Sequence, residues 1–341
     1  MTKGLPELRK SISGWATKRF SLKANSLTAE QHIIPVNGTR EALFAFAQAV
    51  IDTQSKPLVK PLVMMPNPFY QIYEGAAFLA GAEPHYLNCL ATNNYLPDLD
   101  SITQDQWQRC QLFYICSPNN PSGAVFKKAD YQKLIGLADQ HDFIIASDEC
   151  YSEIYPSDEQ VPTGLLEVCS DIGRDNFKRC IVFHSLSKRS NLPGMRSGFV
   201  AGDAQIIETF LKYRTYHGCA MSLPTQVASI AAWSDELHVI NNRKLYREKF
   251  TRVAQILKGV WELDQPEAGF NFWAKTPIDD ELFTQKLFEA QHITVLPGSY
   301  LSREIEGMNP GKNYVRMALV APLEECIEAA ERIKTFFLTQ L

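Results

Sequence analysis

The stretch 181-IVFHSLSKRSNLPGMRSGFVAG-202 places a lysine directly after an apolar run. Ser185 and Ser187 precede Lys188, and Arg196 follows it eight residues later. A lysine just past the end of a buried strand is unusual, because such positions normally hold turn formers. Its amine can form a Schiff base with an aldehyde, and the nearby hydroxyls and guanidinium can hold a phosphate. Pyridoxal phosphate (PLP) carries both groups, so the stretch predicts a PLP enzyme.

The composition is that of an ordinary globular protein, with 341 residues, 45% hydrophobic and 21% charged. The net charge of −4 gives no electrostatic signal for nucleic-acid binding. No apolar run approaches the roughly 20 residues that span a bilayer, and residues 1–15 lack the apolar core of a secretory signal. The eight cysteines are scattered without a CxxC pair. We therefore expect a cytoplasmic protein with reduced cysteines, no metal site, and no nucleic-acid or membrane partner.

Short apolar runs alternate with helical patterns, which predicts an α/β fold whose mostly parallel sheet is covered by helices. The predicted strands are 61–65, 83–87, 111–116, 143–147, 180–184 and 198–202. The predicted helices between them are 39–51, 71–81 and 128–142. A long charged amphipathic stretch, 237–259, then leads into a smaller α+β region. The predicted parts are a helical segment 1–27 packing with the small domain, a large cofactor-binding domain 28–236 and a small domain 237–341.

Polar residues follow three of the predicted strands, at the sheet edge where open α/β proteins bind ligands. They deliver an amide (Asn120), a carboxylate and a phenol (Asp148 and Tyr151) and an amine (Lys188). A carboxylate facing the ring nitrogen of PLP keeps that nitrogen protonated, a role that Asp148 fits. A phenol and an amide can hydrogen-bond the ring oxygen, which Tyr151 and Asn120 fit.

A phosphate requires backbone N–H groups at a helix N-terminus, with hydroxyls and a guanidinium. The predicted cofactor-binding residues of this kind are Gly38, Thr39, Arg40, Ser185, Ser187 and Arg196. An aromatic side chain should cover the ring, and Tyr70 is the candidate, with Phe69 and Tyr73 as rivals. Taken singly, each of these residues also fits a turn, a cap, a surface charge or a core position. Their joint occurrence at strand ends favours the cofactor site.

These segments resemble the fold-type I, class I aminotransferases. The matching stretches are NGTREALF (37–44), PFYQIY (68–73), SPNNPSG (117–123), SDECY (147–151), SLSKRSNLPGMRSG (185–198) and NYVRMAL (313–319). The resemblance implies the PLP-dependent transferase fold type I, a smaller α+β C-terminal domain and a homodimer. It implies that Lys188 is the catalytic Schiff-base lysine. It also implies that Arg316 grips the substrate α-carboxylate together with Asn120, a task that suits a planar guanidinium fork.

Segments 67–84, 147–155, 184–194 and 213–222 are similar to the N-succinyldiaminopimelate aminotransferases. This implies amino transfer between glutamate or 2-oxoglutarate and N-succinyl-2-amino-6-oxoheptanedioate, in lysine biosynthesis through diaminopimelate. The distal acid of such a substrate requires a second cation, for which Arg19, Arg189 and Arg214 are unranked candidates.

Two other functions remain as alternatives, and two further ones are disfavoured by the sequence. One is another class I aminotransferase, of acetylornithine type or broad specificity, and another is a fold-type I PLP lyase, since fold does not fix function. A non-catalytic PLP-binding regulator would need a DNA-binding module, and no basic helix-turn-helix extension is seen. A nicotinamide-dependent enzyme would need a G-x-G-x-x-G turn after a strand, which the sequence lacks.

Members of the family usually carry about fifty further residues before the match to TKGLPELR (2–9). That part supplies an aromatic side chain that reaches the cofactor phosphate of the other subunit, and a glycine-containing segment that closes over the substrate. If the protein begins at Met1, we expect it to bind the cofactor but to close poorly over substrate and to be weakly active. Residues 216–222 are expected either near the active site of the other subunit or in interface packing.

Overall fold

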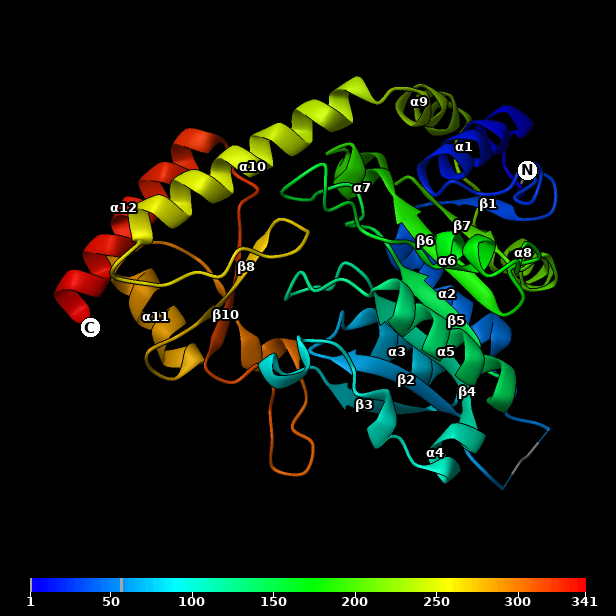
Figure 1. Cartoon of the computed structure of the whole chain (residues 1–341), viewed down its shortest axis with the longest axis horizontal. Helices are drawn as coiled ribbons and strands as arrows, with labels where there is room; N and C mark the ends of the chain where they lie inside the picture. The colour runs from blue at the N-terminus through cyan, green and yellow to red at the C-terminus, as the bar shows by residue number, and fades with distance from the viewer. Residues whose placement is uncertain (1, 56–57) are drawn as a thin grey trace.

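A seven-stranded sheet in the order β1-β7-β6-β5-β4-β2-β3 forms the centre of the larger part of the molecule (Figure 1). The structure is a computed structural model and describes residues 2–55 and 58–341. The strands are β1 (Ile33–Val36), β2 (Leu62–Asn67), β3 (Glu83–Asn88), β4 (Cys110–Cys116), β5 (Ile144–Asp148), β6 (Cys180–Ser185) and β7 (Gly198–Gly202). Strands β2 to β6 run parallel, whereas β7 is antiparallel to β6 and β1 is antiparallel to β7. The predicted α/β fold with a mostly parallel sheet is confirmed.

Helices cover both faces of this sheet, because alternate residues of a strand point to opposite sides. Val63 and Met65 of β2 face one apolar cluster, while Leu62 and Met64 face another. The helices over the first face are α2 (Thr39–Val50), α3 (Ile72–Leu79) and α8 (Ala204–His217). Those over the second are α1 (Pro6–Arg19), α4 (Gln104–Arg109), α5 (Lys128–His141), α6 (Leu165–Asp171) and α9 (Leu223–Ser234).

A smaller α+β part follows, built on a three-stranded antiparallel sheet in the order β8-β10-β9. Its elements are α10 (Leu237–Leu257), β8 (Asn271–Lys275), α11 (Asp280–Gln291), β9 (Leu296–Pro297), β10 (Tyr314–Ala318) and α12 (Leu323–Gln340). These elements share an apolar cluster of their own. Short 3₁₀ turns occur at Ala91–Asn93 (η1), Leu99–Ser101 (η2), Pro193–Met195 (η3) and Gly298–Leu301 (η4).

The N-terminal segment needs a correction. The sequence places residues 1–27 against the small domain, but the structure packs α1 against α9 and β1 of the larger part (Figure 1). Leu8, Ile12 and Trp15 join the apolar cluster beneath the large sheet, and burial of these side chains holds the helix there. The domain boundaries themselves remain a prediction.

Strand β1 was not predicted. It has only four residues, and Pro35 lies within it. A proline cannot donate to the ladder, so such a strand is confined to a sheet edge, which is where β1 lies. In the described part of the chain, no helix has the length and apolar character needed to cross a membrane.

Candidate active site

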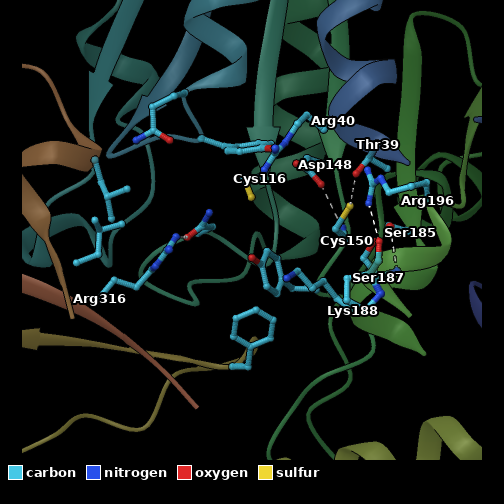
Figure 2. Close-up of a pocket in the computed structure, with 18 of the residues that line it drawn as sticks. Thr39, Arg40, Cys116, Asp148, Cys150, Ser185, Ser187, Lys188, Arg196 and Arg316 are labelled. Carbon is cyan, nitrogen blue, oxygen red and sulfur yellow. Dashed lines mark hydrogen bonds between the residues drawn. The ribbon is translucent and has the colours of Figure 1, made fainter. Parts of the chain in front are cut away.

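A cavity of about 720 Å³ opens where β4, β5 and β6 end, with part of its wall supplied by the small sheet (Figure 2). Every residue predicted for the site lines this cavity except Gly38, which directly precedes the lining residue Thr39. Lining residues that the sequence did not single out are Gln71, Cys116, Cys150, Pro193, Phe270, Leu296, Tyr300 and Leu301. Polar residues at strand ends thus predicted the part of the lining that the large domain supplies. The residues that the small domain supplies follow no such pattern in the sequence.

Lys188 lies on α7 (Leu186–Arg189), a single helical turn that begins directly after β6. The Ser185 hydroxyl caps this turn by accepting a hydrogen bond from the Ser187 amide at 3.1 Å. The Lys188 amine lies 4.4 Å from the centroid of the Phe270 ring. Burial lowers the pKa of Lys188, and the positive charge of Arg316 acts in the same direction. A lowered pKa makes the neutral, nucleophilic amine more accessible.

Asp148 is buried at the end of β5, one strand away from Lys188 in the sheet. The Tyr73 hydroxyl donates to its Oδ2 at 2.8 Å, and the Cys150 amide donates to its Oδ1 at 3.3 Å. Burial raises the pKa of Asp148, while the hydrogen bonds from Cys150 and Tyr73 act against that rise. The carboxylate is therefore held in a fixed orientation, facing the cavity.

Tyr73 has a different position from the one considered in the sequence. Its side chain is fully buried on α3 and stacks on Tyr114, with ring centroids 4.7 Å apart. The cavity is instead lined by Tyr70. The sequence could not tell which tyrosine covers the ring and which one bonds the carboxylate, because Tyr70 lies just before α3 and Tyr73 lies in its first turn.

A cup of donors lies at the start of α2. Gly38, which precedes the helix, has a φ of 82°, and a Cβ at this position would collide with the guanidinium of Arg196. The positive φ favours glycine at this position, and the absence of a side chain leaves room for the Arg196 guanidinium. Among the described residues, no side chain caps the first amides of α2, which begins at Thr39. Together with Ser185 and Arg196 (Figure 2), these amides form a site suited to a phosphate.

Arg40 points away from this cup. Its Nε donates to the Tyr70 hydroxyl at 2.5 Å, and its guanidinium carbon lies 5.9 Å from the Tyr70 ring centroid. In Figure 2 it extends along the upper wall of the cavity, apart from Arg196. Arg40 is exposed and has no carboxylate partner within the part of the chain that the structure describes. The structure therefore separates Arg40 from the other predicted phosphate ligands.

Arg316 reaches the cavity from β10 of the small sheet, opposite Lys188 (Figure 2). Its NH1 donates to Asn120 Oδ1 at 3.0 Å, so an amide of the large part meets a guanidinium of the small part. The Nε of Arg316 is buried and has no hydrogen-bond partner among the described residues. Tyr151 is close by, and burial raises the pKa of its phenol. The guanidinium is positioned to bind an anion inside the cavity.

The three arginines considered for a distal acid do not line the cavity. Each is already held by a carboxylate, in the pairs Arg19–Glu153, Arg189–Glu236 and Arg214–Glu41. Arg214 is fully buried, and the Arg189 guanidinium carbon lies 5.1 Å and 4.8 Å from the ring centroids of Trp15 and Trp233. These arginines are structural ion-pair partners in this chain.

The charges that line the cavity are strongly unbalanced. Its basic side chains are Arg40, Lys188, Arg196 and Arg316, and Asp148 is its acidic side chain. The uncapped helix start with its hydroxyls and Arg196 fits a phosphate, Lys188 fits an aldehyde, and the buried Asp148 fits a ring nitrogen. The residues present therefore fit PLP, and positive charge is left over for an acidic substrate.

Comparison with known sequences places the chain in a family. Residues 1–333 match the family "Aminotransferase class I and II". The LL-diaminopimelate aminotransferase of Maridesulfovibrio salexigens is 30% identical over 336 residues, covering 97% of this chain and 81% of the relative. The LL-diaminopimelate aminotransferase of Aquifex aeolicus is 31% identical over 341 residues, covering 98% and 82%.

Solved structures agree with this assignment. An aminotransferase from Neisseria meningitidis superimposes with a TM-score of 0.93 at 49% identity, covering 99% of this chain and 84% of that one. A probable N-succinyldiaminopimelate aminotransferase from Thermus thermophilus gives a TM-score of 0.83 at 26% identity, covering 97% and 84%. The chain therefore belongs to the class I and II aminotransferases.

Proposed function

We propose that this chain transfers an amino group between glutamate and N-succinyl-2-amino-6-oxoheptanedioate. As a class I and II aminotransferase, it is a PLP-dependent enzyme that acts on small amino-acid and oxo-acid substrates. The observation that carries the substrate assignment is the excess of basic over acidic side chains in the cavity. This excess suits substrates that carry a carboxylate at each end.

We assign Lys188, Asp148 and the α2 cup to the cofactor and the proton transfer. PLP, when bound, supplies an aldehyde carbon and an electron-withdrawing ring that accepts the charge left at the substrate Cα. Lys188 would hold the aldehyde carbon of the bound cofactor, and its neutral amine would take the Cα proton of the substrate as a general base. Its lowered pKa favours the neutral amine that this role needs. Asp148 would face the ring nitrogen and keep it protonated, while Ser185 and Arg196 would hold the phosphate.

Two arginines receive the substrate in this proposal. Arg316 binds the α-carboxylate, which both substrates share, and Asn120 orients its guanidinium through their hydrogen bond. Arg40 binds the distal acid, because it lines the same cavity and its guanidinium is not paired with a carboxylate of the described residues. This role replaces the phosphate role expected for Arg40 from the sequence.

The competing substrate is LL-diaminopimelate, which appears in the names of the two sequence relatives. Its distal end carries an ammonium as well as a carboxylate, and an ammonium needs an acidic partner. Asp148 is the acidic residue among those that line the cavity, and it is assigned to the ring nitrogen. Succinylation turns the distal ammonium into a neutral amide and adds a carboxylate, so the charge of the cavity favours the succinylated substrate.

The reverse reaction tests this assignment directly. With 2-oxoglutarate as acceptor, glutamate formation is measured with N-succinyl-LL-diaminopimelate, LL-diaminopimelate or N-acetylornithine as donor. We expect kcat/KM to be at least about tenfold higher for the succinylated donor, a difference of about 1.4 kcal/mol in transition-state binding. A preference for LL-diaminopimelate or N-acetylornithine would overturn the assignment and leave the aminotransferase activity in place.

We also infer that the chain acts as a homodimer. Apolar side chains are exposed along α8 and α9, among them Tyr216 (83% exposed), Leu223 (61%) and Val227 (60%). Exposed apolar surface of this kind is typical of an interface. Residues 216–222 are expected from the sequence either near the active site of the other subunit or in interface packing, and a second copy of this chain is the partner that fits.

A further inference from the structure

One wall of the cavity, formed by the smaller part of the molecule, is bonded to strand β2 of the large sheet through residues that do not themselves line the cavity. The segment 296–303 of the smaller part supplies Leu296, Tyr300 and Leu301 to the lining. Immediately after these residues, Arg303 contacts the end of β2 and helix α3 by both its backbone and its side chain. This contact joins the two parts of the molecule.

The backbone contact is made by Asn67, the last residue of β2, whose side chain is fully buried. Its Nδ2 donates to the Arg303 carbonyl at 2.8 Å, and its Oδ1 accepts from the Arg303 amide at 2.9 Å. The second Nδ2 hydrogen is used by Asn88 Oδ1 at 2.8 Å. The Asn67 side-chain amide thus makes the same pair of hydrogen bonds to the Arg303 backbone that a neighbouring strand would make. Because this amide is buried and all its hydrogen-bonding groups are used, it holds the Arg303 backbone in a defined position.

The side-chain contact is a bidentate ion pair with Glu74 of α3. Arg303 Nε and NH2 donate to the two Glu74 carboxylate oxygens at 2.8 and 2.7 Å. The Glu74 side chain is only 14% exposed, and Tyr86 also donates to it at 2.5 Å. Because two parallel hydrogen bonds join the guanidinium and the carboxylate, the pair fixes the orientation of the Arg303 side chain as well as its distance from Glu74. A further hydrogen bond between the same two segments runs from the Phe69 amide to the Leu301 carbonyl at 2.9 Å.

The fastened segment leads directly to the substrate-binding strand. It continues from β9, and Leu296 of β9 is paired in register with Arg316 of β10. Lys188 lies on α7, directly after β6 of the large sheet, and Arg316 lies on β10 of the small sheet, so their separation depends on how the small sheet is held against the large one. Fixing Arg303 fixes β9, and β9 in turn fixes the strand that carries Arg316.

We propose that Asn67, Glu74 and Arg303 form a clamp that positions Arg316 and the Tyr300 wall for binding the substrate carboxylate. None of the three lines the cavity, so they act as positioning residues. The inference rests on the proposed role of Arg316 in holding the α-carboxylate. Displacing a binding group by about 1 Å is enough to weaken a reaction severely, so the clamp controls substrate affinity without touching the substrate.

The test uses the PLP-loaded protein and its half-reaction with glutamate, which needs no assumption about the acceptor. In Arg303→Ala, we expect the apparent Kd for glutamate to rise about tenfold, while cofactor affinity and the rate at saturating glutamate stay within about twofold. Glu74→Gln, which keeps the size of the side chain, should give a smaller rise of the same kind. Arg174→Ala is the matched control, because Arg174 makes a similar bidentate pair with Asp139 but does not line the cavity.

The outcomes separate the clamp from the assignment on which it rests. If Arg316→Ala weakens glutamate binding but Arg303→Ala and Glu74→Gln bind glutamate like the wild type, the clamp is wrong. A parallel loss of cofactor affinity in the clamp variants would show a merely structural role and would also overturn the inference. If Arg316→Ala itself binds glutamate normally, the role of Arg316 fails, and the clamp fails with it.

Discussion

At the scale of single residues, the surroundings of a polar group in the cavity set its protonation state. Asp148 is the clearest case, because burial raises its pKa and the hydrogen bonds from Cys150 and Tyr73 oppose that rise. A carboxylate that must stay charged beside a ring nitrogen gains from donors of this kind. Tyr73 therefore supports the chemistry from outside the cavity.

Replacing Tyr73 by phenylalanine tests this support. Tyr73→Phe removes the 2.8 Å hydrogen bond to Asp148, so the pKa of Asp148 should rise further and its charged form should become scarcer as pH falls. We expect kcat to fall about tenfold, most strongly at the acidic end of the pH profile, with a loss of about 1–2 kcal/mol in unfolding free energy.

The matched control is Tyr114→Phe. Tyr114 is also fully buried, stacks on Tyr73 and donates to the Leu43 carbonyl at 2.7 Å, but it makes no hydrogen bond to Asp148. It should lose a similar amount of stability in urea unfolding and keep its kcat. Equal kcat values for the two variants would contradict the role given to Tyr73.

The sequence predicted most of the residues that line the cavity, because Asn120, Asp148 and Lys188 each follow a strand and this pattern is local. It did not predict which direction a long side chain takes. Arg40 was grouped with the phosphate ligands because it follows Thr39, yet it extends to Tyr70 in the loop before α3. Such contacts join residues far apart in the chain, and only the tertiary structure shows them.

At the scale of elements, the strands with strong apolar runs were predicted to within one or two residues, whereas β1 was missed. Helix α1 was misplaced for a different reason. Its apolar residues predict a packed helix, but they do not say which surface receives it, and the receiving surface is α9 and β1. When a helix packs against elements that are distant in sequence, its own residues do not indicate which elements those are.

Helices α8 and α9 also carry the dimer proposal. Val227→Glu places a charge in the centre of the exposed apolar face, and burying an unpaired charge is costly. We expect this variant to lose the dimer and to show the 38.5 kDa mass of a single chain by light scattering. Leu282→Glu, on the exposed side of α11, is the control and should leave the dimer intact. A wild-type chain that is monomeric at micromolar concentration would refute the proposal.

At the scale of the whole molecule, the site exists only because two sheets face each other. The large sheet supplies the amine, the carboxylate and the phosphate cup at its strand ends, and the small sheet supplies Arg316 and the Tyr300 wall. The ends of parallel strands are the usual ligand site of such sheets. The second sheet adds the substrate carboxylate site, and the contact at Arg303 holds the two together.

The most direct test of the account is a single-turnover measurement on Lys188. PLP-loaded wild type, Lys188→Ala and the surface control Lys128→Ala are mixed with glutamate, and the rate of 2-oxoglutarate formation is followed. The account predicts that Lys188→Ala loses at least about a thousandfold of this rate, because no other amine among the residues lining the cavity can take the Cα proton, while Lys128→Ala is unchanged. A Lys188→Ala variant that forms 2-oxoglutarate at the wild-type rate would contradict it.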